Sequence, residues 1–190
     1  MTNVILAGVG GQGVLLSCRV LMEAARRAGH DVKESEVHGM AQRGGSVDCH
    51  VRYGKNVASP LIPRGAADIL VAFELCEAVR KLEYLAPDGR MLVNNLQIEP
   101  STVQSGAMEY PADLDAWLQD NVTNLHLLNT LPALRAVGSK RCLNILMLGA
   151  ASGFTGIDLK HWTDAVETVL KPQHVDMNLK AFELGRQMLA

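Results

Sequence analysis

A glycine-rich segment near the start of the chain has the residue types of a loop that binds an anion. In the pattern GxGxxG it comprises Gly8, Gly10, Gly11, Gln12 and Gly13, and it follows the apolar run NVILAG. Glycine lets the backbone approach a ligand closely, and a helix beginning there offers unpaired N–H groups and positive potential. A phosphate, a diphosphate or a carboxylate would suit such a loop. The same glycines also suit a tight turn that only packs a helix on a sheet.

A second segment combines an imidazole, an amide and a guanidinium with a glycine-rich backbone. Its sequence is HGMAQRGGS, and the residues of interest are His38, Gln42, Arg43, Gly44, Gly45 and Ser46. His38 could act as an acid or base, Arg43 could bind a carboxylate or phosphate through two hydrogen bonds, and Gln42 could orient either. We take His38, Gln42 and Arg43 as candidate catalytic residues. Residues 43–46, with the first glycine segment, are candidate cofactor-binding residues; a packed histidine and an interface arginine are the alternatives.

Other site chemistries find little support in the residue spacing. The four cysteines, Cys18, Cys49, Cys76 and Cys142, are far apart and form no CxxC motif. We therefore expect reduced, mostly buried thiols, no iron–sulfur cluster and no metal site. The chain also lacks HExxH spacing and a Ser/His/Asp order, which argues against hydrolase chemistry.

The composition indicates an ordinary globular chain of 190 residues that forms one domain over residues 1–190. The formal net charge is -2, so no basic surface for nucleic acid is indicated. Neither a signal peptide nor an apolar stretch long enough to cross a membrane is found. We therefore expect a cytoplasmic protein that binds neither nucleic acid nor membrane.

The elements that would position these segments alternate between strands and helices. Apolar runs predict strands at 3–8, 68–73 and 90–94, and helical spacing follows at 14–28 and 74–85. Strands are also predicted at 31–37, 46–53 and 125–128. This order predicts an α/β fold with three layers, α/β/α, around a mixed and mostly parallel sheet.

Three further details can be predicted. The turn at Gly54 leads into 57–62, which suggests a hairpin whose second strand lies at an edge because of Pro60 and Pro63. Residues 87–89 (Pro-Asp-Gly) read as a turn before the strand at 90–94. Helices are expected from about 111, at 132–137 and over most of 142–189, and the first part of the last region is rich in small residues that permit close packing.

With these segments in hand, the chain resembles the gamma-type subunits of the 2-oxoacid:ferredoxin oxidoreductases, which act on pyruvate, ketoisovalerate or indolepyruvate. The resemblance is strongest to the small beta subunit of the indolepyruvate enzymes. It rests on GVGGQG, on EVHGMAQRGGS, on the HVR that follows, on the strand 68–73 ending at Glu74, and on Asn178 to Gly185.

The resemblance implies oxidative decarboxylation of a 2-oxoacid to an acyl-CoA. Thiamine diphosphate, Mg, iron–sulfur clusters and coenzyme A would serve the assembled enzyme, and none of them would be bound by this chain alone. The implied partners are a larger thiamine- and cluster-binding subunit and ferredoxin as acceptor, with a homodimer as a form of the isolated chain. The two glycine-rich segments would face the shared active site or coenzyme A.

Two alternatives stay open. The chain could be a non-catalytic assembly module of such a complex. It could also be an independent oxidoreductase that uses GxGxxG to bind a dinucleotide, with Glu34 or Glu36 near the position of a ribose-binding acid.

Overall fold

The computed structural model describes residues 1–38, 45–99, 103, 106 and 109–189. Its centre is a six-stranded sheet in the order β2-β3-β1-β4-β5-β6. The strands are β1 (Thr2–Val9), β2 (Asp31–His38), β3 (Ser46–Gly54), β4 (Ala67–Ala72), β5 (Leu85–Asn94) and β6 (Leu125–Leu128). β1, β4, β5 and β6 are parallel neighbours, whereas β3 runs antiparallel to both β1 and β2. The predicted mixed, mostly parallel sheet is confirmed.

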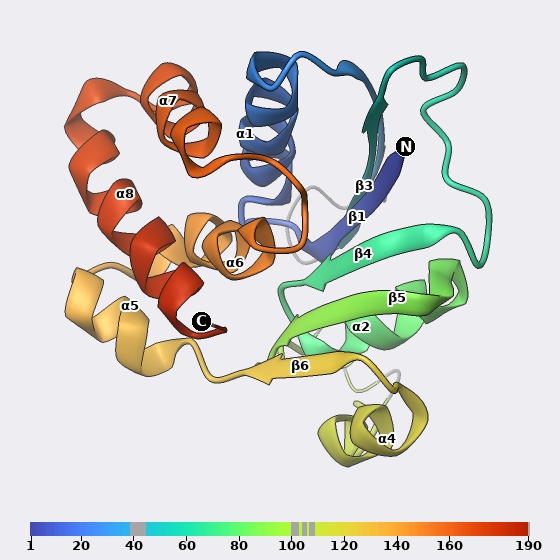
Figure 1. Cartoon of the computed structure of the whole chain (residues 1–190). Coiled ribbons are helices and arrows are strands. Elements are labelled where there is room, and N and C mark those ends of the chain that lie inside the picture. The colour runs from blue at the N-terminus through green and yellow to red at the C-terminus, as the bar shows by residue number, and fades with distance from the viewer. Residues whose placement is uncertain (39–44, 100–102, 104–105, 107–108, 190) are drawn as a thin grey trace.

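Helices cover both faces of this sheet (Figure 1). One layer holds α1 (Val14–Arg27), α5 (Leu131–Val137), α6 (Leu143–Ser152), α7 (Leu159–Val169) and α8 (Pro172–Gln187). The opposite layer holds α2 (Leu75–Lys81) and α4 (Leu114–Asn121), and short 3-10 turns occupy Leu82–Tyr84 and Lys140–Cys142. The central strands are apolar on both faces, because each face packs on a helix layer: Val4 and Leu6 join one core cluster, and Ile5 and Leu70 join the other.

The packing of α6 on α8 confirms the prediction that small residues bring a helix close to a neighbour. A Cβ atom added at Gly149 would meet the backbone of Phe182, and one added at Gly185 would meet the backbone of Leu146. These two glycines therefore allow the backbones of the two helices to touch.

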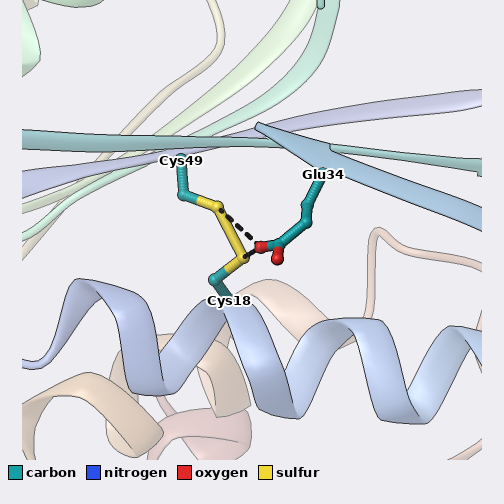
Figure 2. Close-up of side chains that lie close together, drawn as sticks. All are labelled: Cys18, Glu34 and Cys49. Carbon is teal, nitrogen blue, oxygen red and sulfur yellow. Dashed lines mark hydrogen bonds between the residues drawn. A yellow bond between two sulfur atoms is a disulfide. The ribbon is translucent and has the colours of Figure 1, made fainter. Parts of the chain in front are cut away.

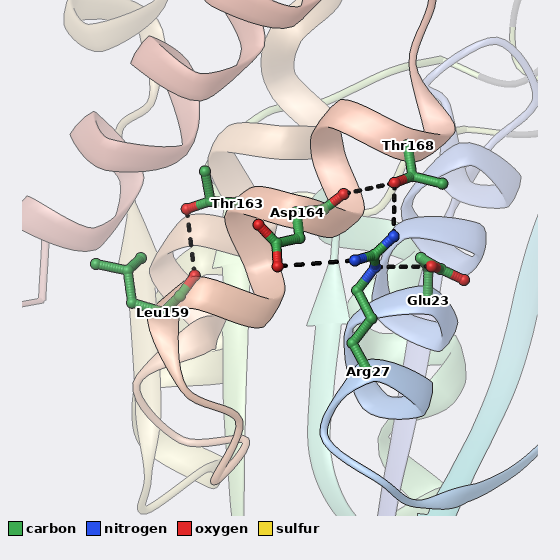
Figure 3. A network of polar contacts seen from close by, with 6 residues as sticks. All are labelled: Glu23, Arg27, Leu159, Thr163, Asp164 and Thr168. Carbon is green, nitrogen blue, oxygen red and sulfur yellow. Dashed lines mark hydrogen bonds and ion pairs between the residues drawn. The ribbon is translucent and has the colours of Figure 1, made fainter.

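The outer helix α7 packs beside α1, and Arg27 links the two (Figure 3). Its Nε lies 2.8 Å from Oε1 of Glu23 on the same helix, and its Nη2 donates to Oγ1 of Thr168 at 2.9 Å. Its Nη1 lies 3.7 Å from the carboxylate of Asp164. The end of α1 is thus held to the outer layer by polar contacts as well as by apolar packing.

The predicted hairpin at 57–62 is wrong, because this segment forms no strand. Side chains replace the expected ladder. Arg52 donates through Nη1 to the carbonyl oxygens of Ser59 and Leu61, each at 2.9 Å, and Nδ1 of His50 accepts from the amide of Ile62 at 3.1 Å. Pro60 and Pro63 have no N–H to pair, which explains why a ladder does not form there. The antiparallel element of the sheet is β3 itself.

Two other predictions need correction. Residues 87–89 do not form a turn between a helix and a strand, because they lie inside β5. β5 pairs with β4 in a register that is irregular between Ala67 and Ile69 of β4. β3 was also expected to be half-buried, yet its polar residues Asp48 and His50 are buried as well. The reason is that α2 and the 57–62 segment cover the face that the polar alternation appeared to leave to solvent.

The expectation of four reduced thiols is wrong for two of them. Cys18 of α1 and Cys49 of β3 are joined by a disulfide, with 6.5 Å between their Cα atoms (Figure 2). The two are 31 residues apart, but α1 packs directly on β3 and brings the sulfurs together. Cys76 and Cys142 are free.

Among the residues described, no helix combines the length and the apolar character needed to cross a membrane.

Candidate functional site

The glycine loop joins the end of β1 to the start of α1. Gly11 and Gly13 have φ angles of +105° and +83°, which side-chain-bearing residues rarely adopt. Gly13 is also the N-cap residue of α1 and supplies no side-chain cap. Because the first N–H groups of a helix have no partner within it, α1 presents donors and positive potential at this loop.

Gln12 braces the loop. Its Oε1 accepts a hydrogen bond from the amide of Val9 at 2.8 Å, and its Nε2 donates to the carbonyl oxygen of Phe73 at 2.9 Å. These bonds tie the end of β1 to the end of β4. Gly8 is a packing position, because a Cβ atom there would lie 2.9 to 3.0 Å from Gln12, Val14 and Phe73.

A cavity of about 540 Å³ opens beside this loop. It lies at the carboxyl ends of the parallel strands, where open α/β sheets bind their ligands. Its walls come from the glycine loop, the end of β5, α5 and the start of α6, with these lining residues: Gly11, Gln12, Gly13, Leu16, Asn94, Asn95, Leu96, Ile98, Thr130, Leu131, Leu134, Lys140, Arg141, Leu143 and Asn144. It thus combines leucine side chains with two cations and several amides.

The polar groups of this cavity are partly engaged with one another. Asn94 donates through Nδ2 to the carbonyl oxygen of Phe73 at 3.1 Å and accepts from the hydroxyl of Thr130 at 2.8 Å. Asn144 donates to the carbonyl oxygen of Gly13 at 3.3 Å, whereas its Oδ1 is buried and has no hydrogen-bond partner among the described residues. Buried polar atoms without a partner are uncommon, which makes Asn144 a candidate ligand contact.

Lys140 and Arg141 stand at the exposed rim of the cavity, one turn before α6. With the amino end of α1 they give this region positive potential, so an anionic group can bind at the rim while an apolar portion lies against the leucines. Sequence reasoning missed Lys140, Arg141 and Asn144, because about 130 residues separate them from the glycine loop.

The second segment reaches the glycine loop through the backbone. The amide of Gly10 donates to the carbonyl oxygen of Gly45 at 2.8 Å, and Val9 pairs with Ser46 in the sheet. The Gly10 N–H is therefore already engaged. The hydroxyl of Ser46 donates to Oε2 of Glu77 at 2.5 Å, on the α2 side of the sheet.

Most of the remaining candidate residues of this segment are not among the residues that the structure describes. Gln42, Arg43 and Gly44 are outside the described residues, and His38 is described only as the last residue of β2, paired with Val47. Their proposed roles stay predictions.

A buried polar cluster lies on the α2 side, behind Ser46. Lys81 of α2 pairs with Asp48 at 2.7 Å, and Nε2 of His50 lies 3.5 Å from the same carboxylate. Burial raises the pKa of Glu77, although the hydrogen bond from Ser46 and the charge of Arg80 oppose this. Glu77 and Asp48 were not singled out from the sequence; the one available signal was the charged residues on one face of β3.

The strand order argues against dinucleotide binding at the glycine loop. In the doubly wound fold, the acid that binds the ribose comes from the strand parallel and adjacent to β1. Here Glu34 and Glu36 lie on β2, and the antiparallel β3 separates β2 from β1. The acids are thus displaced from the position that the motif requires.

The sequence as a whole matches the family model described as pyruvate ferredoxin/flavodoxin oxidoreductase over residues 3–188. The chain belongs to this family. Two relatives are named indolepyruvate oxidoreductase subunit IorB. The one from Archaeoglobus fulgidus is 36% identical over 96% of this chain and 92% of its own length. The one from Pyrococcus horikoshii is 35% identical over 96% and 93%.

Solved structures of oxidoreductases in this group share the fold. Pyruvate oxidoreductase subunit PORC from Thermotoga maritima superposes with a TM-score of 0.73 at 24% identity, covering 98% of this chain and 95% of that one. A 2-oxoglutarate:ferredoxin oxidoreductase from Magnetococcus marinus, with 2-oxoglutarate, coenzyme A and succinyl-CoA bound, gives 0.75 at 18% identity, over 99% of this chain and 31% of that chain. In such oxidoreductases this chain has the role of a small subunit beside larger ones.

Proposed function

We propose that the chain is the small subunit of an indolepyruvate-type 2-oxoacid:ferredoxin oxidoreductase and that its cavity binds the anionic part of coenzyme A. The relatives named IorB, at 33% identity or more over nearly the whole chain, support the substrate class. Thiamine diphosphate, Mg and the iron–sulfur clusters belong to the larger partner subunit in this proposal, and ferredoxin accepts the electrons in the cytoplasm.

The donor residues of this chain support that division of labour. Cys76 and Cys142 are separate from the Cys18–Cys49 pair, so the cysteines do not provide the four converging thiolates of an iron–sulfur cluster. When bound on the partner, thiamine diphosphate supplies the electron sink for decarboxylation. The task left to this chain is to hold and orient the acyl acceptor.

The observation that carries the proposal is the convergence of the uncapped amino end of α1 with Lys140 and Arg141 on one cavity. A diphosphate suits these donors, and the leucine walls suit the less polar pantetheine arm. Arg43 remains the candidate for a further anion contact, from the segment that follows β2.

The experiment uses the chain assembled with its partner and follows 2-oxoacid-dependent viologen reduction. The double variant Lys140→Ala/Arg141→Ala is expected to raise the KM for coenzyme A by about tenfold or more, the scale of one lost charge-assisted hydrogen bond, with little change in the KM for the 2-oxoacid. Arg135→Ala is the matched control, because Arg135 is exposed on α5 and does not line the cavity.

The outcomes are distinct. An unchanged KM for coenzyme A in the double variant rejects the cavity as its site, and failure to assemble favours a pure assembly module. A panel of indolepyruvate, phenylpyruvate, pyruvate, 2-ketoisovalerate and 2-oxoglutarate tests the substrate class. Turnover by the isolated chain with a nicotinamide or a flavin would reject the subunit role.

A further inference from the structure

A second cluster of reactive side chains lies away from the cavity, between α1 and the sheet. It brings together Cys18 of α1, Cys49 of β3 and Glu34 of β2 (Figure 2). One donor atom from each residue lies within 4.8 Å of the other two. Oε2 of Glu34 is 2.9 Å from Sγ of Cys18 and 3.8 Å from Sγ of Cys49. Three elements thus aim sulfur and oxygen at one point.

A thioether adds a fourth donor to this cluster. Met22 follows Cys18 by one helical turn, and its Sδ lies 3.8 Å from Sγ of Cys18. Both cysteines have no exposed surface, and Met22 is buried. The full set is therefore two cysteine sulfurs, one thioether and one carboxylate, all buried except Glu34, which is partly exposed.

The charge of the cluster is suited to a cation. Within the described part of the chain, the Glu34 carboxylate lies against the two cysteine sulfurs. A disulfide has no proton to donate to this carboxylate, but a bound cation would pair with it directly.

The distances agree with tetrahedral coordination. With Zn–S bonds of about 2.3 Å, neighbouring sulfur ligands lie about 3.8 Å apart. The Cys18–Met22 pair of sulfurs already has this separation. Rotation about the Cα–Cβ bond of either cysteine would separate the two sulfurs without moving the backbone.

We propose that, once the Cys18–Cys49 disulfide is reduced, Cys18, Cys49 and Glu34 bind one thiophilic divalent cation, with Zn²⁺ as the best match and Met22 on the fourth side. A dithiol reductant reduces the S–S bond to two thiols on the chain and is itself oxidised to a disulfide. Binding of Zn²⁺ then forms two Zn–S bonds and releases the two thiol protons. No redox change occurs at the metal.

Such a site would be structural. It would tie α1, which leads out of the glycine loop, to β3 and to the edge strand β2. With four donors from this chain around it, the ion would have no open position for substrate, so it would stabilise the fold at this edge and take no part in the reaction. The proposal does not depend on the function proposed above.

The test uses the whole chain, reduced with a dithiol, freed of reductant without oxygen, and titrated with Zn²⁺ against a chromophoric chelator. We expect one ion per chain, about two protons released per ion, and a higher Tm with metal. Co²⁺ serves as a spectroscopic probe and should give thiolate-to-metal charge-transfer absorption. Cys49→Ser and Glu34→Gln should each weaken binding by at least about tenfold, the lower end of what losing even an outer-shell partner costs.

Cys142→Ser is the control, because Cys142 is also a buried cysteine but lies outside the cluster. Its metal binding should equal that of the unmodified chain. If Cys49→Ser does not fold, Glu34→Gln decides, because it keeps both sulfurs and the side-chain shape. A reduced chain with four free thiols that takes up no Zn²⁺ overturns the proposal, as does a disulfide that survives reduction or an equal affinity in Glu34→Gln.

Discussion

Lys81 reaches from α2 to the buried carboxylate of Asp48 on β3, with 2.7 Å between Nζ and Oδ1. Asp48 is 3% exposed and also lies 3.5 Å from Nε2 of His50. Burial by itself would raise the pKa of Asp48, but the hydrogen bonds from His50 and Lys81 outweigh burial and lower the pKa. The buried negative charge of Asp48 on β3 is therefore held by Lys81, which comes from the helix α2 packed on that face of the sheet.

Replacing Lys81 tests this pair. Lys81→Met keeps most of the chain length and removes the charge, so Asp48 would stay buried without its main partner. We expect the free energy of unfolding at neutral pH to fall by about 3 kcal/mol, as measured by urea denaturation. Arg64→Met is the control, because its pair with Glu83 is exposed and should contribute less than about 1 kcal/mol. Equal losses in the two variants would contradict the argument.

Glu77 should give a pH dependence of the opposite sign to that of a salt-bridged acid. Because its folded pKa is raised, its contribution to stability is complete below the unfolded value near 4.5 and is lost as the pH rises through the folded value. Glu77→Gln should therefore gain stability relative to the unmodified chain as the pH increases above 4.5. Thermal or urea unfolding from pH 4 to about pH 8 measures the difference, with exposed Glu167→Gln as the control. A difference that is flat across this range would show that the folded pKa is not raised.

The contact of α6 with α8 should be intolerant of a single methyl group. In Gly149→Ala the new Cβ would run into the backbone of Phe182, which cannot rotate away. We expect a loss of about 2 to 3 kcal/mol or more, detected as a lower midpoint of urea unfolding. Gly153→Ala is the matched control, because Gly153 has a helical φ and its added Cβ would have no atom of the described residues within 4 Å. That variant should be neutral or slightly more stable, and a comparable loss there would point to a backbone effect instead.

Gly13 should matter for the cavity beyond its backbone conformation. Gly13 and Gly29 have nearly the same positive φ. Among the described residues, an added Cβ at Gly13 would meet the Asn144 side chain at 2.8 Å, whereas one at Gly29 would meet no atom within 4 Å. Gly29→Ala should therefore cost about 1 to 2 kcal/mol through strain alone. Gly13→Ala should cost more and also raise the KM for coenzyme A in the assembled enzyme. Equal losses of stability with an unchanged KM would mean that the contact with Asn144 has no role in the cavity.

Local pattern in the sequence was enough to predict most of the elements. The apolar runs at β1 and β4 and the helical spacing of α1 depend on periods of two and 3.6 residues, which each stretch of chain carries by itself. The glycine loop and the alternation of strands and helices likewise predicted a mostly parallel sheet between two helix layers. The motifs at 8–13 and 36–46 were sufficient to predict the family.

The wrong secondary-structure predictions concern segments whose local sequence pattern is overridden by contacts with residues elsewhere in the chain. The turn-like residues 87–89 read as a break, but they lie inside β5, where Leu85 and Arg90 on either side of them pair with β4. The strand-like residues 57–62 read as a hairpin, but Arg52 and His50 take their backbone groups instead. In both cases the deciding partners lie outside the short stretch of sequence that carries the local signal.

Only the tertiary structure decided which side chains meet. Cys18 and Cys49 are 31 residues apart, and Asn144 follows Gly13 by more than a hundred, yet each pair is in contact. These contacts depend on the rotation of one helix relative to the register of a strand or to the position of another helix. The sequence determined what each element is and which residues share its faces. The packing of one element on another determined the cavity and the cluster of Cys18, Cys49 and Glu34, because spacing along the chain carries no information about that relative placement.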